Sequence, residues 1–313
     1  MNAKLSRSFI DKNQTYITPQ KNHNYREFDE VTVHGTLCAG VIAAEKGNDI
    51  CLAGVAYNAT LVALKVFSIE ERYLEQGRWQ GKHFNYDKVH LALEHERDEI
   101  DMFSCSFNVE EPFIRNELLT RSVLKEGVEK GRHGKGSIYV FSAGNSGDET
   151  WIHDRNLETF ANSIFTLVFN SMGINGSRPT YIRKGACILA ATVGDHKLLT
   201  GDPLTTTSYN DGCKAFSGTA RAAEFIALML EANRNLTWRD AAYIIAYTSS
   251  LDAAKHVTKR TNGAGLKFNA YFGFGLLNET AMVLKAKEWE MVPPLQNRTF
   301  SATMMISIRT VSC

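Results

Sequence analysis

The stretch Ser137-Ile-Tyr-Val-Phe-Ser-Ala-Gly-Asn145 decides the fold class of this chain. Most of its first seven residues are apolar and β-branched or aromatic, which predicts a β-strand over 137–143. The glycine and asparagine that follow predict a tight turn where the strand ends. A helical pattern over 117–131 comes just before, so strand and helix alternate in this part of the chain.

The same alternation extends in both directions along the chain. Strands are predicted over 59–67, 100–107, 163–170 and 186–192, and helices over 34–45, 86–97, 117–131, 220–233 and 237–249. The run 59–67 is almost continuously apolar, as in a parallel strand that is buried on both faces. Thr237 is a suitable N-cap for the last helix. This pattern predicts an α/β fold, a doubly wound parallel sheet flanked by helices.

Composition excludes several classes of protein. The 313 residues are 44% hydrophobic and 22% charged, with 35 Lys and Arg against 34 Asp and Glu. This balance excludes a strongly basic nucleic-acid binder, and no apolar run reaches the roughly 20 residues of a membrane span. Only six prolines occur and no flexible linker divides the chain, so we expect a single domain.

Three segments lie where chemistry is expected in such a fold. Ligands of open parallel sheets bind where the strands end and the following loops begin. These positions are occupied by the start of the helix at His34, the turn at Asn145, and the loop 215–220. An imidazole there could act as a base, and an amide could stabilise an oxyanion by about 3 kcal/mol. Taken singly, a histidine at a helix start is more often a cap or surface residue, and an asparagine in such a turn more often serves the turn itself.

Taken together and in order, these segments resemble the subtilisin/kexin class of serine endopeptidases, specifically the proprotein convertases and, in the last two blocks, their neuroendocrine members. The resemblance covers about residues 8–294. It is carried by His34-Gly-Thr-Leu-Cys-Ala-Gly, Gly54-Val-Ala-Tyr-Asn-Ala, Gly134-Lys-Gly-Ser-Ile-Tyr-Val-Phe-Ser-Ala-Gly-Asn, Asn162-Ser-Ile-Phe-Thr-Leu, Leu230-Glu-Ala-Asn-Arg-Asn-Leu-Thr-Trp-Arg-Asp, Asn262-Gly-Ala-Gly-Leu and Phe272-Gly-Phe-Gly-Leu-Leu-Asn.

The resemblance implies a role for each matching residue. His34 stands at the catalytic base and Asn145 at the oxyanion-hole amide. Ser106 belongs to the segment 104–111 that pairs with the bound peptide, although the family's Ser-Trp-Gly is Ser106-Phe-Asn in this chain. Glu111 and Glu158 fall where convertases place acids for the arginine that precedes the cleaved bond.

Two parts of the catalytic machinery have no match. The family's Gly-Thr-Ser-Ala becomes Gly218-Thr-Ala-Arg, so Ala220 stands at the nucleophile position. Ser217 lies three residues earlier, where the family has an ordinary Thr or Ser. No Asp-Asp-Gly or Asp-Ser-Gly turn precedes His34. A triad needs a hydroxyl, an imidazole and a carboxylate, so we expect little or no turnover.

The resemblance also implies a disulfide and a metal. Cys51 and Cys213 match a convertase disulfide, and calcium is expected in the family. Asn48 and the backbone near Ile50 resemble a calcium loop, with the oxygen ligands that this ion prefers. No secretory signal is visible, although six Asn-x-Ser/Thr triplets occur and the family works in the secretory pathway or outside the cell.

The expected organisation is a subtilase domain over 1–294, truncated at both ends and lacking the family's first strand, followed by a tail over 295–313 that resembles the start of the next convertase domain. The family reaction is the cleavage of precursor proteins after paired basic residues, and this chain is expected to be inactive. The alternatives are a pseudoprotease that binds basic peptides or another convertase, and an incomplete gene product. Neither nucleic acid nor a membrane span is expected.

Overall fold

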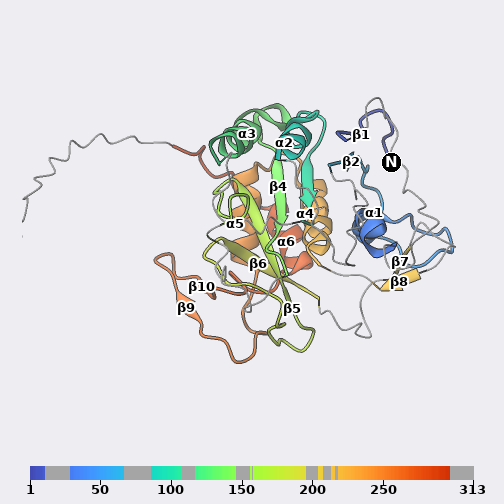
Figure 1. Cartoon of the computed structure of the whole chain (residues 1–313). Helices are drawn as coiled ribbons and strands as arrows, with labels where there is room; N and C mark the ends of the chain where they lie inside the picture. The colour runs from blue at the N-terminus through green and yellow to red at the C-terminus, as the bar shows by residue number, and fades with distance from the viewer. Residues whose placement is uncertain are drawn as a thin grey trace, which may run out of the picture.

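The structure is a computed structural model, and it describes residues 1–10, 29–66, 86–107, 117–145, 156, 158–194, 204–206, 213–215 and 218–296. Its centre is a sheet of four parallel strands in the order β3 (Met102–Cys105), β4 (Ile138–Ser142), β5 (Thr166–Met172) and β6 (Ile188–Val193). Figure 1 shows these strands running side by side between helices. The predicted parallel α/β sheet is confirmed.

Strand β4 shows how the sequence produces three layers. Tyr139 and Phe141 point to one face of the sheet and belong to a first apolar cluster, which includes Val89, Leu93 and Leu124. Ile138 and Val140 point to the other face and belong to a second apolar cluster, which includes Ile226, Ile244 and Met282. All four of these β4 side chains are buried, because successive residues of a strand face opposite sides and both sides are covered.

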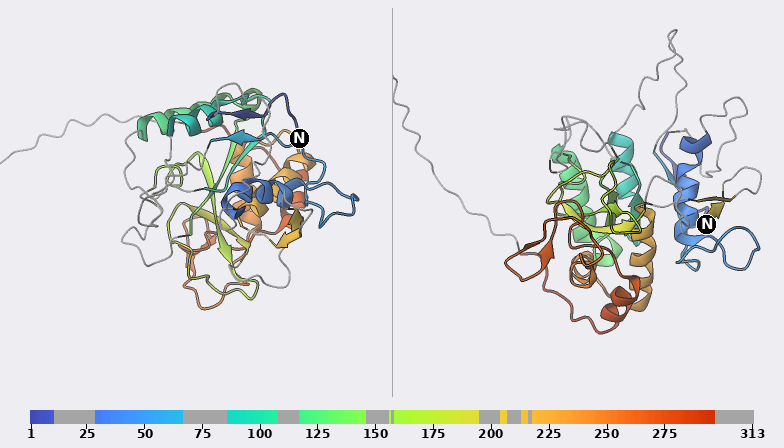
Figure 2. Two further views of the ribbon diagram at one scale, coloured as in Figure 1. Left: turned by 45° about the vertical axis from the view of Figure 1, so that its right-hand side comes forward. Right: turned by 90° about the horizontal axis from the view of Figure 1, so that it is seen from below.

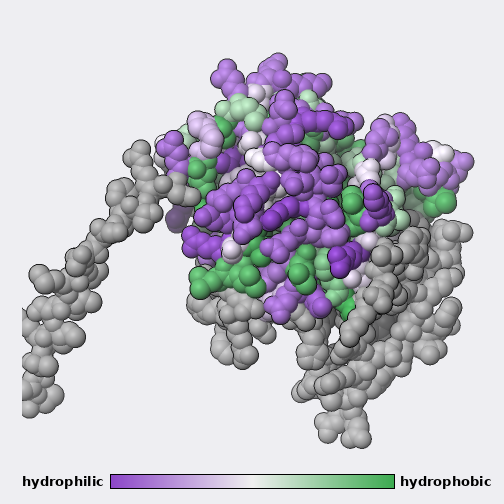
Figure 3. Space-filling view, turned by 90° about the horizontal axis from the view of Figure 1, so that it is seen from above, coloured by the Kyte–Doolittle hydropathy of each residue, from purple (hydrophilic) through white to green (hydrophobic). Residues whose placement is uncertain are grey.

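Helices cover the two faces (Figure 2). One face packs against α2 (Tyr86–Glu94) and α3 (Glu117–Lys130), and the other packs against α4 (Ala220–Ala232), α5 (Trp238–Thr248) and α6 (Glu279–Lys287). The outer surface of α2 and α3 is largely hydrophilic, as expected for helices between core and solvent (Figure 3). No helix of the described ranges is long and apolar enough to cross a membrane.

Smaller elements lie outside this sheet. The antiparallel pairs are β7 (Leu204–Thr206) with β8 (Cys213–Ala215), and β9 (Arg260–Thr261) with β10 (Lys267–Phe268). A parallel pair joins β1 (Arg7–Ser8) to β2 (Leu64–Lys65), and η1 (Arg132–Gly134) is a short 3-10 turn between α3 and β4.

The predicted strand 59–67 needs correction. Within its described part only Leu64 and Lys65 form strand, and they pair with β1 rather than with the four-stranded sheet. Residues 61–66 are half-buried rather than buried on both faces. The apolar run packs beside the first cluster through Val62, Leu64 and Val66, so its composition reflects burial along one side.

Helix α1 (Asp29–Ala43) begins earlier than predicted, so His34 lies in its second turn rather than at its start. Helix α6 and the pair β9–β10 were not predicted. The boundaries of α4 and α5 agree with the prediction to within a residue, and Thr237 caps α5 as expected.

Candidate active site

Helix α1 presents His34 and, one turn later, Cys38. Residues four apart lie on the same side of a helix, and Cys38 Sγ is 3.7 Å from His34 Nδ1. The imidazole is exposed and the thiol is buried. Burial raises the pKa of the Cys38 thiol to about 11, and the Ser106 hydroxyl beside it partly offsets that rise. The thiol is therefore protonated at neutral pH and acts as a small apolar side chain.

The contact with Ser106 joins α1 to the end of strand β3. Ser106 follows Cys105 directly, at the carboxyl edge of the sheet. Because the strands are parallel, the residues that follow β4 lie at this same edge. The structure thus places His34, Cys38 and Ser106 together where a parallel sheet is expected to hold its ligand.

The start of α4 meets α1 at this edge. Ala220 is the first residue of α4, has no exposed surface, and packs in one cluster with Cys38, Val41 and Ile42 of α1. The turn before it is tied to the sheet because Thr192 Oγ1 donates to Gly218 O at 3.3 Å. The position matched to the nucleophile is therefore a buried methyl group against the helix that carries His34.

Asn145 follows strand β4 and is exposed. Its turn begins in the sheet, where Ala143 N donates to Phe169 O at 3.0 Å. Gly144 adopts a φ of +84°, a conformation that side chains disfavour, and its N–H donates to Ser142 Oγ. The strand and the glycine explain why Asn145 emerges at the edge of the sheet.

Glu158 is 4% exposed, and its Oε2 accepts a hydrogen bond from Ala161 N at 2.5 Å. The neighbouring Phe160 stacks on Phe141 of β4 with ring centroids 5.2 Å apart, which anchors this turn to the core. A carboxylate is thus buried on the α2–α3 side of the sheet. Glu111 and Ser217 lie outside the described residues.

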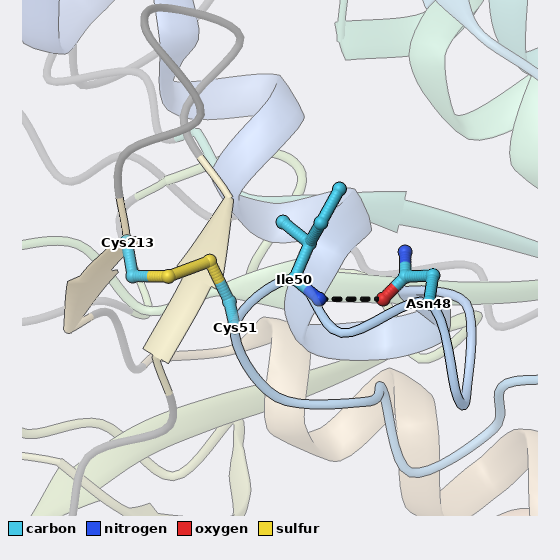
Figure 4. Close-up of a disulfide and its surroundings, with 4 residues drawn as sticks. All are labelled: Asn48, Ile50, Cys51 and Cys213. Carbon is cyan, nitrogen blue, oxygen red and sulfur yellow. Dashed lines mark hydrogen bonds between the residues drawn. A yellow bond between two sulfur atoms is a disulfide. The ribbon is translucent and has the colours of Figure 1, made fainter.

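The loop after α1 carries the residues matched to calcium binding and to the disulfide (Figure 4). Cys51 and Cys213 form the disulfide that the resemblance implied, joining this loop to β8. Asn48 Oδ1 accepts from Ile50 N at 3.1 Å. Calcium requires six to eight oxygen ligands, and the described residues hold no group of three His, Cys, Asp or Glu side chains suited to a metal. The Asp, Glu, His and Cys side chains of the described residues therefore do not by themselves form a calcium site, and Asn48 Oδ1 is already bonded within its own loop.

Glu224 is a buried acid that sequence reasoning passed over. It lies one turn into α4, is 1% exposed, and has Arg221 Nε 3.7 Å from its Oε1. Burial raises the pKa of its carboxyl to about 8, against the smaller effect of Arg221. An acid inside the apolar run Ala222-Ala-Glu-Phe-Ile was the available signal.

The protein is a three-layer α/β protein. Helix α1 with His34, the Gly144–Asn145 turn and the start of α4 lie at one edge of its parallel sheet. Residues 2–275 match the model of the subtilase family. The chain belongs to the subtilase family.

Within this family the chain is a proprotein-convertase-like domain. It is 32% identical over 267 residues to the rat proprotein convertase subtilisin/kexin type 6, covering 83% of this chain and 27% of the rat protein. It is 35% identical over 277 residues to mouse neuroendocrine convertase 2, covering 83% of this chain and 40% of the mouse protein. The chain spans well under half the length of these relatives.

Solved structures support the fold. A serine protease of Aeromonas sobria in complex with a chaperone superposes with a TM-score of 0.69 at 21% identity, over 84% of this chain and 54% of that protein. MycP1 without its N-terminal propeptide superposes with a TM-score of 0.59 at 17% identity, over 91% of this chain and 86% of that one. At these identities the likeness concerns the fold alone.

Proposed function

We propose that this chain is a proprotein-convertase-like serine endopeptidase domain that no longer hydrolyses peptide bonds. The observation that carries the proposal is Ala220, a buried methyl group at the position matched to the nucleophile. Serine endopeptidases of this kind need a hydroxyl to attack the carbonyl carbon, an imidazole to accept its proton and a carboxylate to orient the imidazole. With a methyl group, His34 has no hydroxyl to deprotonate there.

The remaining groups do not replace the hydroxyl. Cys38 Sγ lies 3.7 Å from His34 Nδ1, yet its thiol is buried and burial raises its pKa to about 11. A thiol attacks as the thiolate, which is scarce at neutral pH when the pKa is high. Asn145 could stabilise an oxyanion only after an attack has occurred.

Activity measurements test the proposal. The folded chain is incubated with a fluorogenic peptide that ends in two basic residues, and separately with an organophosphonate probe for reactive hydroxyls and iodoacetamide for reactive thiols. We expect no turnover above that of a His34→Ala control and no labelling of a hydroxyl. Cleavage that a serine-protease inhibitor blocks and that His34→Ala abolishes would contradict the proposal.

A second candidate function is the binding of basic segments of precursor proteins, or of another convertase, without cleavage. It is favoured by the buried carboxylate of Glu158 and by Ser106 at the end of β3, which match the family's substrate-binding positions. Carboxylates form charge-assisted hydrogen bonds with arginine, so positively charged peptides are the expected ligands. Glu111 belongs to the same proposal on sequence grounds.

Calorimetric titration with an arginine-containing peptide measures this binding. Glu158→Gln removes the negative charge but keeps an oxygen that can accept from Ala161 N, and we expect it to weaken binding at least tenfold. Glu231→Gln, on the exposed side of α4, is the matched control and should leave affinity unchanged. Equal affinities for all three proteins, or no binding heat, would leave only a structural role for Glu158.

We place the protein in the secretory pathway or outside the cell, where precursor proteins with basic segments are encountered. The Cys51–Cys213 disulfide supports this location because disulfides persist in oxidising compartments. Gel mobility of the chain purified from its native cells, with free thiols blocked before lysis, tests the location. A fully reduced Cys51–Cys213 pair in those cells would contradict it.

A further inference from the structure

Asparagine–x–serine/threonine triplets form a second set of candidate sites, unrelated to catalysis. Six occur, beginning at Asn13, Asn58, Asn175, Asn235, Asn278 and Asn297. The first and last lie outside the described residues. The remaining four are all exposed at the asparagine, so exposure alone does not separate them. The burial of the apolar side chains beside the asparagines does.

Two of the four triplets open helices. Thr237, the hydroxyl residue of the Asn235 triplet, is the N-cap of α5, and its side chain accepts from Asp240 N while donating to Asp240 Oδ2. Asn278 is itself the N-cap of α6, with its Oδ1 accepting from Ala281 N at 2.9 Å. In both triplets a residue beside the asparagine is buried, Leu236 after Asn235 and Leu277 before Asn278, so the asparagine is held against the apolar core.

The other two triplets lie in turns outside the helices. Asn58 ends the turn 55–58, and its hydroxyl residue Thr60 is exposed as well. Asn175 lies in the turn after β5, where its Oδ1 accepts from Ser177 N at 2.9 Å. That bond joins the asparagine to the hydroxyl residue of its own triplet and uses the side-chain oxygen rather than the nitrogen.

Exposed apolar side chains precede these two asparagines. Tyr57 is 42% exposed and Val55 is 40% exposed beside Asn58, and Ile174 is 60% exposed beside Asn175. A sugar attached at either asparagine would lie over these side chains, and no buried side chain stands beside the acceptor on that side. Neither helix-opening triplet has an exposed apolar residue in the preceding position: Arg234 is charged and Leu277 is buried.

We propose that Asn58 and Asn175 are acceptors for N-linked oligosaccharide, on the surface beside Val55, Tyr57 and Ile174. The donor is an oligosaccharide on a polyprenyl pyrophosphate. The bond between the sugar C1 and the pyrophosphate oxygen breaks, a bond from C1 to Asn Nδ2 forms, and Nδ2 loses one proton as the lipid pyrophosphate leaves. The inference rests on the secretory location proposed above, but not on whether the chain is catalytically active.

Site mapping tests the assignment. The full chain is secreted from cultured animal cells behind a cleavable leader, treated with peptide N-glycosidase in water labelled with oxygen-18, and analysed by peptide mass spectrometry. We expect the label at Asn58 and Asn175. Asn58→Gln and Asn175→Gln should each remove one glycan from the intact mass, and the double variant should remove both.

Matched variants separate loss of the glycan from loss of the asparagine. Thr60→Ala and Ser177→Ala keep both asparagines yet should abolish the glycan at their own triplet, whereas Thr60→Ser and Ser177→Thr should retain it. Because the added leader supplies entry to the lumen, unlabelled Asn58 and Asn175 in the secreted protein would overturn the assignment without bearing on location or catalysis. Labelling at Asn235 or Asn278 in place of these two would overturn it as well.

Discussion

Glu224 shows how one side chain can make the stability of this domain depend on pH. It lies in the apolar interior beside α6, where the neutral acid is favoured over the carboxylate. The pKa of Glu224 is raised from 4.5 to about 8 in the folded chain. Between these values the folded state binds more protons than the unfolded state, so stability falls as pH rises through this window.

We therefore expect Glu224→Gln to gain stability relative to the unchanged protein as pH rises. The difference should grow by about 3 kcal/mol between pH 5 and pH 8, because the ionised acid no longer has to be buried. Urea unfolding at both pH values measures it, with the exposed Glu231→Gln as control. Parallel pH curves for the two proteins would show that Glu224 has an ordinary pKa.

At the scale of elements, α5 and the segment after α6 depend on a single buried acid. Asp240 has no exposed surface, and its Oδ2 accepts from Thr237 N while its Oδ1 accepts from Trp289 Nε1 and Val292 N, each at 2.8 Å. Thr237 completes a capping box with it. The carboxylate of Asp240 thus holds the start of α5 and the segment that follows α6 together.

Thr237→Ala should lower the free energy of unfolding by about 1 kcal/mol because α5 loses its cap. Asp240→Ala should cost about 3 kcal/mol or more, since several buried donors lose their acceptor. Chemical unfolding of protein made in bacteria measures both changes. Thr237→Ser keeps the hydroxyl and should match the unchanged protein; a loss as large as that of Thr237→Ala would argue against the capping role.

The loop that carries Asn48 predicts how the thermal stability of the protein responds to calcium. Asn48 Oδ1 is bonded within its own loop, and no metal-suited cluster occurs in the described ranges. We expect the melting temperature to stay within about 1 °C when calcium is added or removed with a chelator, because an ion bound to the folded state alone would raise it. A calcium-dependent rise that Asn48→Ala abolishes would establish a site there.

An element could be predicted where its own residues determine its structure, and could not where a distant segment of the chain does. The strand β4 and the helices α4 and α5 follow from periodicity and caps in their own residues, so their ranges were predictable. The run 59–67 has strand-like composition, but its pairing with β1 depends on which chain segment lies beside it. Helix α6 has no strong apolar stripe, and only the cap at Asn278 marks its start.

The candidate site divides in the same way. The assignments of Ala220, His34 and Asn145 came from the resemblance to a family whose motifs keep their order along the chain, and their roles stay predictions. The contact of Cys38 with Ser106 and the burial of Glu224 could not be derived from the sequence, since each depends on segments from different parts of the sequence meeting in space.

At the scale of the whole molecule, the Cys51–Cys213 disulfide links the loop after α1 to β8 across a sequence separation of 162. Cross-linking so long a loop stabilises the folded state by about 3–5 kcal/mol, chiefly by restricting the unfolded chain. The paired substitutions Cys51→Ser and Cys213→Ser should lower the free energy of unfolding by this amount. Thermal unfolding under non-reducing conditions measures it, and adding a reductant should lower the stability of the unchanged protein only. An unaltered melting temperature in the variant would mean that the bridge adds nothing.

The order of the central strands has a consequence for synthesis. Each of β4, β5 and β6 pairs with the strand made just before it, so the sheet can grow from β3 one strand at a time as the chain leaves the ribosome. Cys213 emerges only after all four strands, while Cys51 precedes them. Oxidation of this pair is therefore a late event, and Cys51 must remain a free thiol, open to exchange with other cysteines, while most of the domain is being translated.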